Sequence, residues 1–177
     1  EPSWANHRGL MTSGGLNVSS YTYYDAATKS LDFNGMLRSL EELPENTAVL
    51  MHACCHNPTG LDPSPEQWQI LSSTIKELRL IAFFDIAYQG FKTSLDEDAY
   101  PIRLFAQNGH NLLAAYSFAK NMGLYGERAG ALSCVSSHAH KAAIVQSYFK
   151  KLIRVCYSSP PIHAAAIVHT ILNTPAL

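Results

Sequence analysis

Residues 115–128, Ala-Tyr-Ser-Phe-Ala-Lys-Asn-Met-Gly-Leu-Tyr-Gly-Glu-Arg, are the stretch from which the fold and its chemistry are best inferred. They continue an apolar run, residues 111–115, that predicts a buried strand. Lys120 follows the end of that strand, where partial desolvation disfavours a charged ammonium and leaves an amine able to form a Schiff base. Ser117 and Arg128 can together hold an anion such as phosphate. This combination meets the minimum needs of pyridoxal 5'-phosphate (PLP), although a loop lysine is also commonly a solvated cation.

The composition argues against several classes of protein. The 177 residues contain 13 Lys and Arg against 14 Asp and Glu, a formal net charge of −1. We expect no nucleic-acid partner, because no basic run follows a phosphate backbone. We also expect no membrane partner, because no apolar stretch approaches the roughly 18 residues of a span. The four cysteines lack a disulfide framework, which favours a reduced, cytoplasmic setting with organelles left open.

Hydrophobic periodicity and turn residues predict alternating helices and strands. The expected helices cover residues 2–15, 33–43, 64–78, 98–107, 139–155 and 161–172, and the expected strands cover residues 16–24, 48–53, 80–84, 111–116 and 130–135. Turns are expected over residues 25–30 and 57–60. The alternation predicts one α/β domain, residues 1–177, with a mostly parallel sheet flanked by helices.

Polar side chains follow three of these strands in succession. They are His52 to Asn57, Asp85 to Tyr88, and Ser117 to Lys120. Parallel topology would bring the three strand ends to one edge of the sheet, where ligands of such folds bind.

At that edge the residue types match the needs of PLP. Asp85 can pair with the pyridine nitrogen, and Tyr88 and Asn57 can hydrogen-bond the phenolic oxygen. Lys120 can form the Schiff base and then move the proton of the substrate α-carbon. Trp4 can stack on the ring.

Simpler interpretations of these residues stay open at this point. Asp85 alone is typical of a helix N-cap, and Trp4 is typical of a core or an interface. The three histidines in the relevant segments (His7, His52 and His56) are typical structural residues. The segment 52–56, His-Ala-Cys-Cys-His, lacks the separated ligand pairs of zinc sites, so we expect no metal.

Six motifs carry a family resemblance and occur in family order over essentially all 177 residues. They are residues 2–7 (PSWANH), 56–60 (HNPTG), 84–91 (FDIAYQGF), 117–121 (SFAKN), 123–128 (GLYGER) and 157–161 (YSSPP). The sequence thereby resembles the aspartate aminotransferases, with their aromatic amino-acid branch, of fold type I of the PLP enzymes.

The resemblance implies the fold-type-I large domain and the cofactor roles argued above. By similarity, Trp4 stacks on the cofactor and His7 supports Asp85 from behind. The resemblance also implies that Arg154 reaches into the neighbouring subunit's site and binds the distal carboxylate of aspartate or glutamate. Trp4, Asn57 and Arg154 are therefore expected to contact substrate, and a homodimer with shared sites is expected.

Two features depart from the family pattern. Ser158-Ser159-Pro160-Pro161 stands where aspartate-specific members usually carry Ser-Asn-Pro-Pro, and it resembles the branch that also accepts phenylalanine and tyrosine. The chain also resembles only the central part of the family's large domain. The amino-terminal arm and the carboxy-terminal small domain have no counterpart in it.

The expected function is transamination between an amino acid and a 2-oxo acid such as 2-oxoglutarate. We expect the 177 residues alone to be inactive. The alternatives are a non-catalytic fragment or pseudoenzyme that serves as an interaction module, and another PLP reaction such as decarboxylation. Lys120, Asp85 and Arg128 are all present, which argues against the first alternative, and Arg154 argues against the second.

Overall fold

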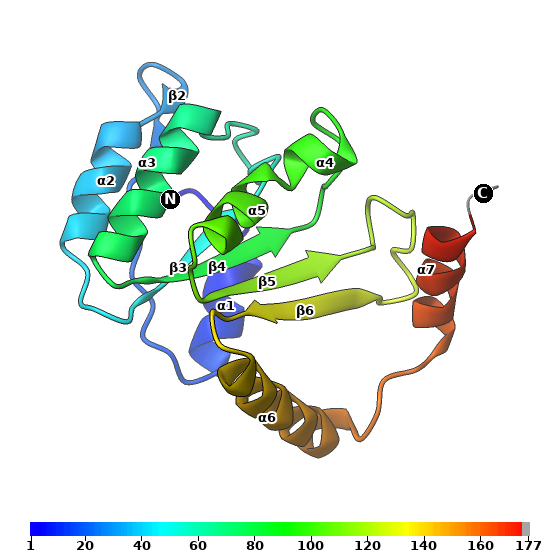
Figure 1. Ribbon diagram of the computed structural model, residues 1–177. Helices are drawn as coiled ribbons and strands as arrows, with labels where there is room; N and C mark the ends of the chain where they lie inside the picture. The colour runs from blue at the N-terminus through cyan, green and yellow to red at the C-terminus, as the bar shows by residue number, and fades with distance from the viewer. Residues whose placement is uncertain (175–177) are drawn as a thin grey trace.

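A four-stranded sheet forms the centre of the computed structural model, which describes residues 1–174 (Figure 1). Its strands lie in the order β3 (Ala48–His52), β4 (Ile81–Ile86), β5 (Leu112–Ser117) and β6 (Gly130–Val135). β3, β4 and β5 are parallel, and β6 is antiparallel to β5. The sheet is therefore mostly parallel, as the sequence predicts.

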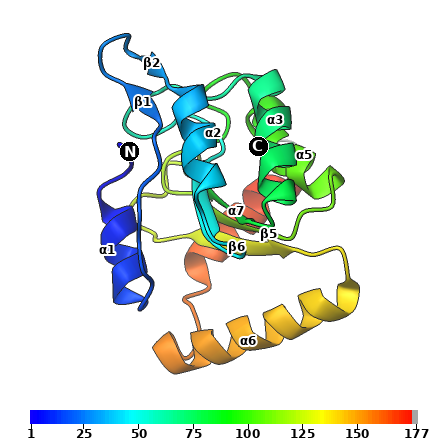
Figure 2. The same ribbon diagram turned by 90° about the vertical axis from the view of Figure 1, so that its left-hand side faces the viewer.

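Helices lie on both faces of this sheet (Figures 1 and 2). α2 (Phe33–Glu41), α3 (Pro65–Glu77) and α5 (Tyr100–Gln107) cover one face, while α6 (Ala139–Tyr157) lies on the other. The remaining helices are α1 (Asn6–Ser13), the short α4 (Leu95–Asp98) and α7 (His163–Asn173). No helix among residues 1–174 has the length and hydrophobicity needed to cross a membrane.

The core lies between the sheet and the helices α2, α3 and α5. Phe84 of β4 and Phe105 of α5 are fully buried, and their rings meet edge to face with centroids 5.1 Å apart. Trp68 of α3 packs against both rings, at 6.1 Å from Phe84 and 6.3 Å from Phe105. Such aromatic packing stabilises a core by more than the buried area alone. It fixes β4, which carries Asp85.

The predicted strand over residues 16–24 is wrong. Only β1 (Tyr24–Asp25) forms there, and it pairs with β2 (Ser30–Leu31) across the predicted turn. The alternating pattern of apolar and polar residues in this segment comes from two tyrosines that point inward. Their hydroxyls donate hydrogen bonds to backbone carbonyl oxygens. Tyr21 donates to the oxygen of Leu50 at 2.8 Å, and Tyr23 donates to that of Leu61 at 2.6 Å. Side chains rather than a strand ladder anchor this segment.

The predicted helix over residues 98–107 is α5, which begins at Tyr100, and no pattern in the sequence predicted the short helix α4 before it. Ser94 caps the start of α4 by accepting through its hydroxyl from the amide of Glu97, and α4 ends at Asp98 before α5 begins. The carboxylate of Asp98 accepts from backbone amides of the preceding loop, so it closes that loop instead of opening the helix.

Candidate active site

The carboxyl ends of β3, β4 and β5 meet at one edge of the sheet, as predicted (Figure 1). His52 on β3 is in register with Asp85 on β4, and Asp85 is in register with Ala115 on β5. Ser117 lies two residues further along β5, on the same face, because side chains alternate along a strand. The register thus brings residues far apart in the sequence to one place.

Asp85 lies within β4 and is not a helix N-cap, so that alternative is wrong. His7 Nε2 lies 2.9 Å from Asp85 Oδ2, and His7 Nδ1 lies 2.9 Å from the hydroxyl of Ser3. Both side chains are largely buried, with 12% and 22% of their surface exposed. With the proton of His7 on Nε2, Ser3 donates to His7 and His7 donates to Asp85. This stabilises the ionised carboxylate.

His52 also lies beside Asp85, but its Nε2 makes no hydrogen bond among the described residues. Its Nδ1 accepts from the amide of Asn57 at 3.3 Å, so the ring proton lies on Nε2, which faces Asp85 Oδ2 at 3.6 Å. Burial lowers the pKa of His52 to about 4, against the opposing attraction of Asp85. Their positions in the sequence could have predicted this approach, because His52 ends β3 and Asp85 lies one residue before the end of the neighbouring strand β4.

Burial also lowers the pKa of His56, to about 3, and His52 adds to the effect. The ring of His56 stacks on Tyr23 at 3.9 Å, with 14° between the planes. Its Nδ1 lies 2.8 Å from the hydroxyl of Thr59. Both histidines are therefore neutral at pH 7, which leaves the negative charge of Asp85 uncompensated by an imidazolium at His52.

The potential ligand atoms of His7, His52 and Asp85 lie within 4.8 Å of one another, a spacing that a metal site would also have. The contact of His7 Nε2 with Asp85 Oδ2 is already a hydrogen bond. We therefore interpret the group as a hydrogen-bonded support for the carboxylate.

Lys120 lies beside Tyr88. Its Nζ is 5.1 Å from the centre of the Tyr88 ring and 5.4 Å from that of Tyr125, a residue that the sequence analysis missed. The next residue, Asn121, donates through Nδ2 to the carbonyl oxygen of Gln89 at 3.4 Å. That bond joins the loop carrying Lys120 to the loop carrying Tyr88.

The hairpin of β5 and β6 brings the backbone near Ser117 close to the backbone near Arg128. Ser117 is in register with Gly130, and the amide of Phe118 donates to the carbonyl oxygen of Ala129 at 3.1 Å. Arg128 adopts a left-handed backbone (φ 55°), and its guanidinium donates to the carbonyl oxygen of Tyr125 at 3.1 Å. A hydroxyl and a guanidinium thus flank the same turn, which is an arrangement suited to an anion.

Two further predicted residues lie at different places. Trp4 is 42% exposed, meets the ring of His7 edge to face at 5.2 Å, and lines a cleft of about 600 Å³ beside β3. Lys120, Asp85 and Tyr88 do not line that cleft. Arg154 belongs to α6, where its guanidinium donates to the hydroxyl of Ser158 instead of joining the cluster around Lys120.

The family model for class I and II aminotransferases matches residues 1–177. The chain belongs to this family. It is 52% identical over 178 residues to a cytoplasmic aspartate aminotransferase of Oryza sativa subsp. japonica, covering 100% of this chain and 44% of the relative. It is 49% identical to a mitochondrial aspartate aminotransferase of Lupinus angustifolius, covering 99% of this chain and 39% of that protein.

Solved structures of the family agree in fold. The aromatic-amino-acid aminotransferase of Burkholderia pseudomallei, solved covalently bound to pyridoxal phosphate, superposes with a TM-score of 0.97 at 47% identity. The match covers 99% of this chain and 44% of that one. The chain therefore spans less than half the length of these relatives.

Proposed function

We propose that the chain contributes the PLP-binding centre of an aminotransferase of the aspartate and aromatic type. The observation that carries the proposal is the meeting of Lys120 with Tyr88 at the strand edge that also holds Asp85 and its histidines. Family membership supports it independently. The reaction exchanges the amino group of an amino acid with the oxo group of a 2-oxo acid.

The residues present fit PLP by their chemistry. Asp85 offers a carboxylate to the protonated pyridine nitrogen, and the phenol of Tyr88 and the amide of Asn57 offer donors to the phenolic oxygen. Ser117 and Arg128 suit the phosphate, and the exposed face of Trp4 suits the ring. When bound, PLP supplies an electron sink for the electron pair left behind as the substrate α-proton departs.

The chain's own residues would handle charge and protons. His7 donates a hydrogen bond to Asp85, which favours the ionised carboxylate that the pyridine nitrogen needs. Once free, the amine of Lys120 would accept the proton from the substrate α-carbon as a general base. As a general acid it would then give up that proton later in the same half-reaction. Tyr88, held beside that amine, orients it.

Substrate and assembly are proposed from the resemblance and the relatives. Arg154, which is exposed on α6 in this chain, would bind the distal carboxylate of aspartate or glutamate in a partner subunit's site. Ser159 favours additional use of tyrosine and phenylalanine. A homodimer with shared sites follows from such an arginine. Cytoplasm is our proposed location, with relatives named from both cytoplasm and mitochondria.

A borohydride trap tests the cofactor site. The chain is incubated with PLP, reduced and digested, and the pyridoxyl-labelled lysine is found by mass spectrometry. We expect one dominant label, on Lys120, that the Lys120→Ala substitution abolishes. The control Lys141→Ala, on exposed α6, should leave the label unchanged. Labels spread evenly over the lysines would refute the proposal.

A further inference from the structure

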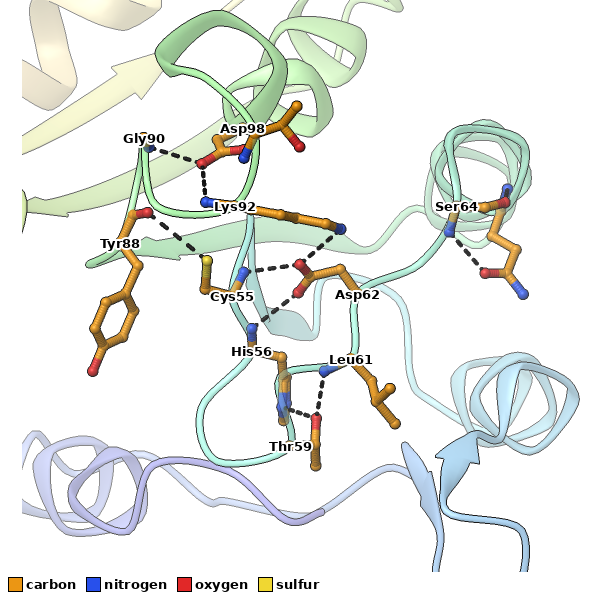
Figure 3. Close-up of polar contacts among 12 residues, drawn as sticks. Cys55, His56, Thr59, Leu61, Asp62, Ser64, Tyr88, Gly90, Lys92 and Asp98 are labelled. Atoms are coloured by element: carbon orange, nitrogen blue, oxygen red, sulfur yellow. Dashed lines mark hydrogen bonds and ion pairs between the residues drawn. The ribbon is translucent and has the colours of Figure 1, made fainter.

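Two buried carboxylates shape the loops that follow β3 and β4 (Figure 3). Asp62 accepts from the amides of Cys55 and His56, both at 2.9 Å, and so closes the loop that carries Asn57. Asp98 accepts from the amides of Gly90, Lys92 and Thr93 at 2.8 to 3.1 Å, and so closes the loop that directly follows Tyr88, here called the Tyr88 loop. Each loop thus has its own internal anchor.

Lys92 joins the two anchors. Its backbone amide is held by Asp98 at 3.1 Å, and its ammonium crosses to Asp62 Oδ2 at 3.0 Å (Figure 3). The side chain of Asp62 is only 2% exposed, against 47% for Lys92. A buried carboxylate binds a cation more strongly than an exposed one does, because water screens the pair less.

The second link between the loops in Figure 3 is much weaker. It is the thiol of Cys55 facing the carbonyl oxygen of Tyr88 at 3.9 Å, and a thiol is a poor donor. Lys92 and Asp62 therefore provide the charged link between the Asn57 loop and the Tyr88 loop.

We propose that Lys92 is a positioning residue that, through Asp62, sets the separation of Asn57 and Tyr88. The inference rests on the proposed function, in which these two side chains donate to one phenolic oxygen. Two donors serve one oxygen only when both lie within hydrogen-bond distance of it, so small loop displacements are costly. Neither Lys92 nor Asp62 needs to touch the cofactor for this effect.

The link has a spectroscopic consequence. Donors to the phenolic oxygen withdraw its negative charge, which lowers the proton affinity of the neighbouring Schiff-base nitrogen formed with Lys120. When the link is broken, the donors loosen. The pH at which the bound chromophore changes absorbance should then rise.

The test compares Lys92→Met, Lys92→Arg and Asp62→Asn with the unchanged 177-residue chain. Lys92→Met keeps the aliphatic stem and removes the charge, whereas Lys92→Arg keeps the charge. Arg79→Met is the matched control, because it removes one positive charge from an exposed pair, Arg79 with Glu45 at 3.3 Å. Far-UV circular dichroism verifies that each variant is folded.

Amide hydrogen exchange is the first readout and needs no cofactor. We expect faster exchange at Cys55 and His56 in Lys92→Met and in Asp62→Asn, and exchange near the unchanged rate in Lys92→Arg and Arg79→Met. Equal protection in Lys92→Met and the unchanged chain would overturn the inference whatever PLP does.

PLP titration is the second readout. We expect about a fivefold weaker binding in Lys92→Met, the scale of one well-placed ion pair, with an upward shift of the absorbance midpoint that Lys92→Arg reverses. If Lys92→Met loses amide protection at Cys55 and His56 but keeps the same absorbance midpoint, the Lys92–Asp62 pair has only a structural role. That result would overturn the positioning role. An unchanged chain that fails to label Lys120 would refute the proposed function, and the positioning role with it.

Discussion

At the residue scale, burial holds His52, which lies beside Asp85, neutral at pH 7. The pKa of His52 in the folded chain is about 4, below the value near 6.5 of an exposed histidine. Between those two pH values the unfolded chain binds a proton that the folded chain does not. The free energy of unfolding must therefore fall as the pH drops from about 6.5 towards 4, and it is insensitive to His52 above that window.

This linkage gives a prediction for His52→Gln. Denaturant unfolding of the unchanged chain should lose on the order of 2–3 kcal/mol between pH 6.5 and 4 through His52. The His52→Gln variant should show a flatter dependence, whatever its stability at pH 7. His140→Gln, exposed on α6, serves as the control and should keep the original slope. Equal slopes for His52→Gln and the unchanged chain would assign the acid sensitivity to other groups.

At the scale of single elements, α3 begins with a complete capping box. The hydroxyl of Ser64 accepts from the amide of Gln67, and the side chain of Gln67 accepts from the amide of Ser64. Pro65, the first residue of this helix, suits the position because it has no amide hydrogen to leave unbonded. α3 packs Trp68 against Phe84, so the cap also stabilises the core beneath Asp85.

Removing the cap should have a measurable cost. Ser64→Ala should lower the free energy of unfolding by about 1 kcal/mol, because the amide of Gln67 loses its acceptor. Ser73→Ala, in the exposed interior of the same helix, should be neutral or slightly stabilising. Chemical denaturation of the two variants at pH 7 makes the comparison. A cost at Ser73 equal to that at Ser64 would contradict the assignment.

The hairpin of β5 and β6 requires glycine at position 130. A Cβ added there would lie 2.6 Å from the backbone oxygen of Tyr116, a distance that neither strand can relieve by a side-chain movement. The clash lies next to Ser117, the register partner of Gly130. The connection that carries Arg128 leaves β5 after Ser117 and enters β6 at Gly130.

Gly130→Ala should therefore destabilise the chain by about 1–3 kcal/mol, the usual cost of overpacking, and reduce the trapped label on Lys120. Gly126→Ala is the matched control, since a Cβ there has no atom within 4 Å. Thermal unfolding and the borohydride trap should both separate the two variants. Indistinguishable behaviour would show that β6 can move away from β5 at no cost.

At the scale of the whole molecule, β6, α6 and α7 expose many large apolar side chains. Leu132, Tyr148, Leu152 and Val155 are between 51% and 78% exposed. The chain covers 44% of the length of its rice relative. The 177 residues therefore correspond to less than half of such a relative.

We therefore predict that the 177-residue chain binds PLP through Lys120 but does not transaminate. A coupled assay with aspartate and 2-oxoglutarate should give a rate at the level of free PLP, because substrate orientation needs more groups than the cofactor-binding centre supplies and the chain spans less than half of a relative. Phenylalanine and tyrosine should behave in the same way. Turnover that Lys120→Ala abolishes would contradict this prediction.

Much of this protein could be predicted from its sequence. The periodicity predicted the central strands and most helices, and the strand ends predicted that Asp85, Tyr88, Ser117 and Lys120 lie along one edge of the sheet, because parallel strands place their carboxyl ends together. Local physics decides these features: hydrophobic period, caps and turn residues act over a few residues. The segment over residues 16–24 misled the prediction because alternating tyrosines can satisfy either a strand or side-chain anchors.

Only the tertiary structure decided which distant residues meet. The approach of His52 to Asp85 and the crossing of Lys92 to Asp62 both depend on strand register and loop closure. The lowered pKa of His52 is likewise a property of burial, which no local pattern contains. Residue types set what chemistry was possible, and packing decided which groups lost water and which partners replaced it.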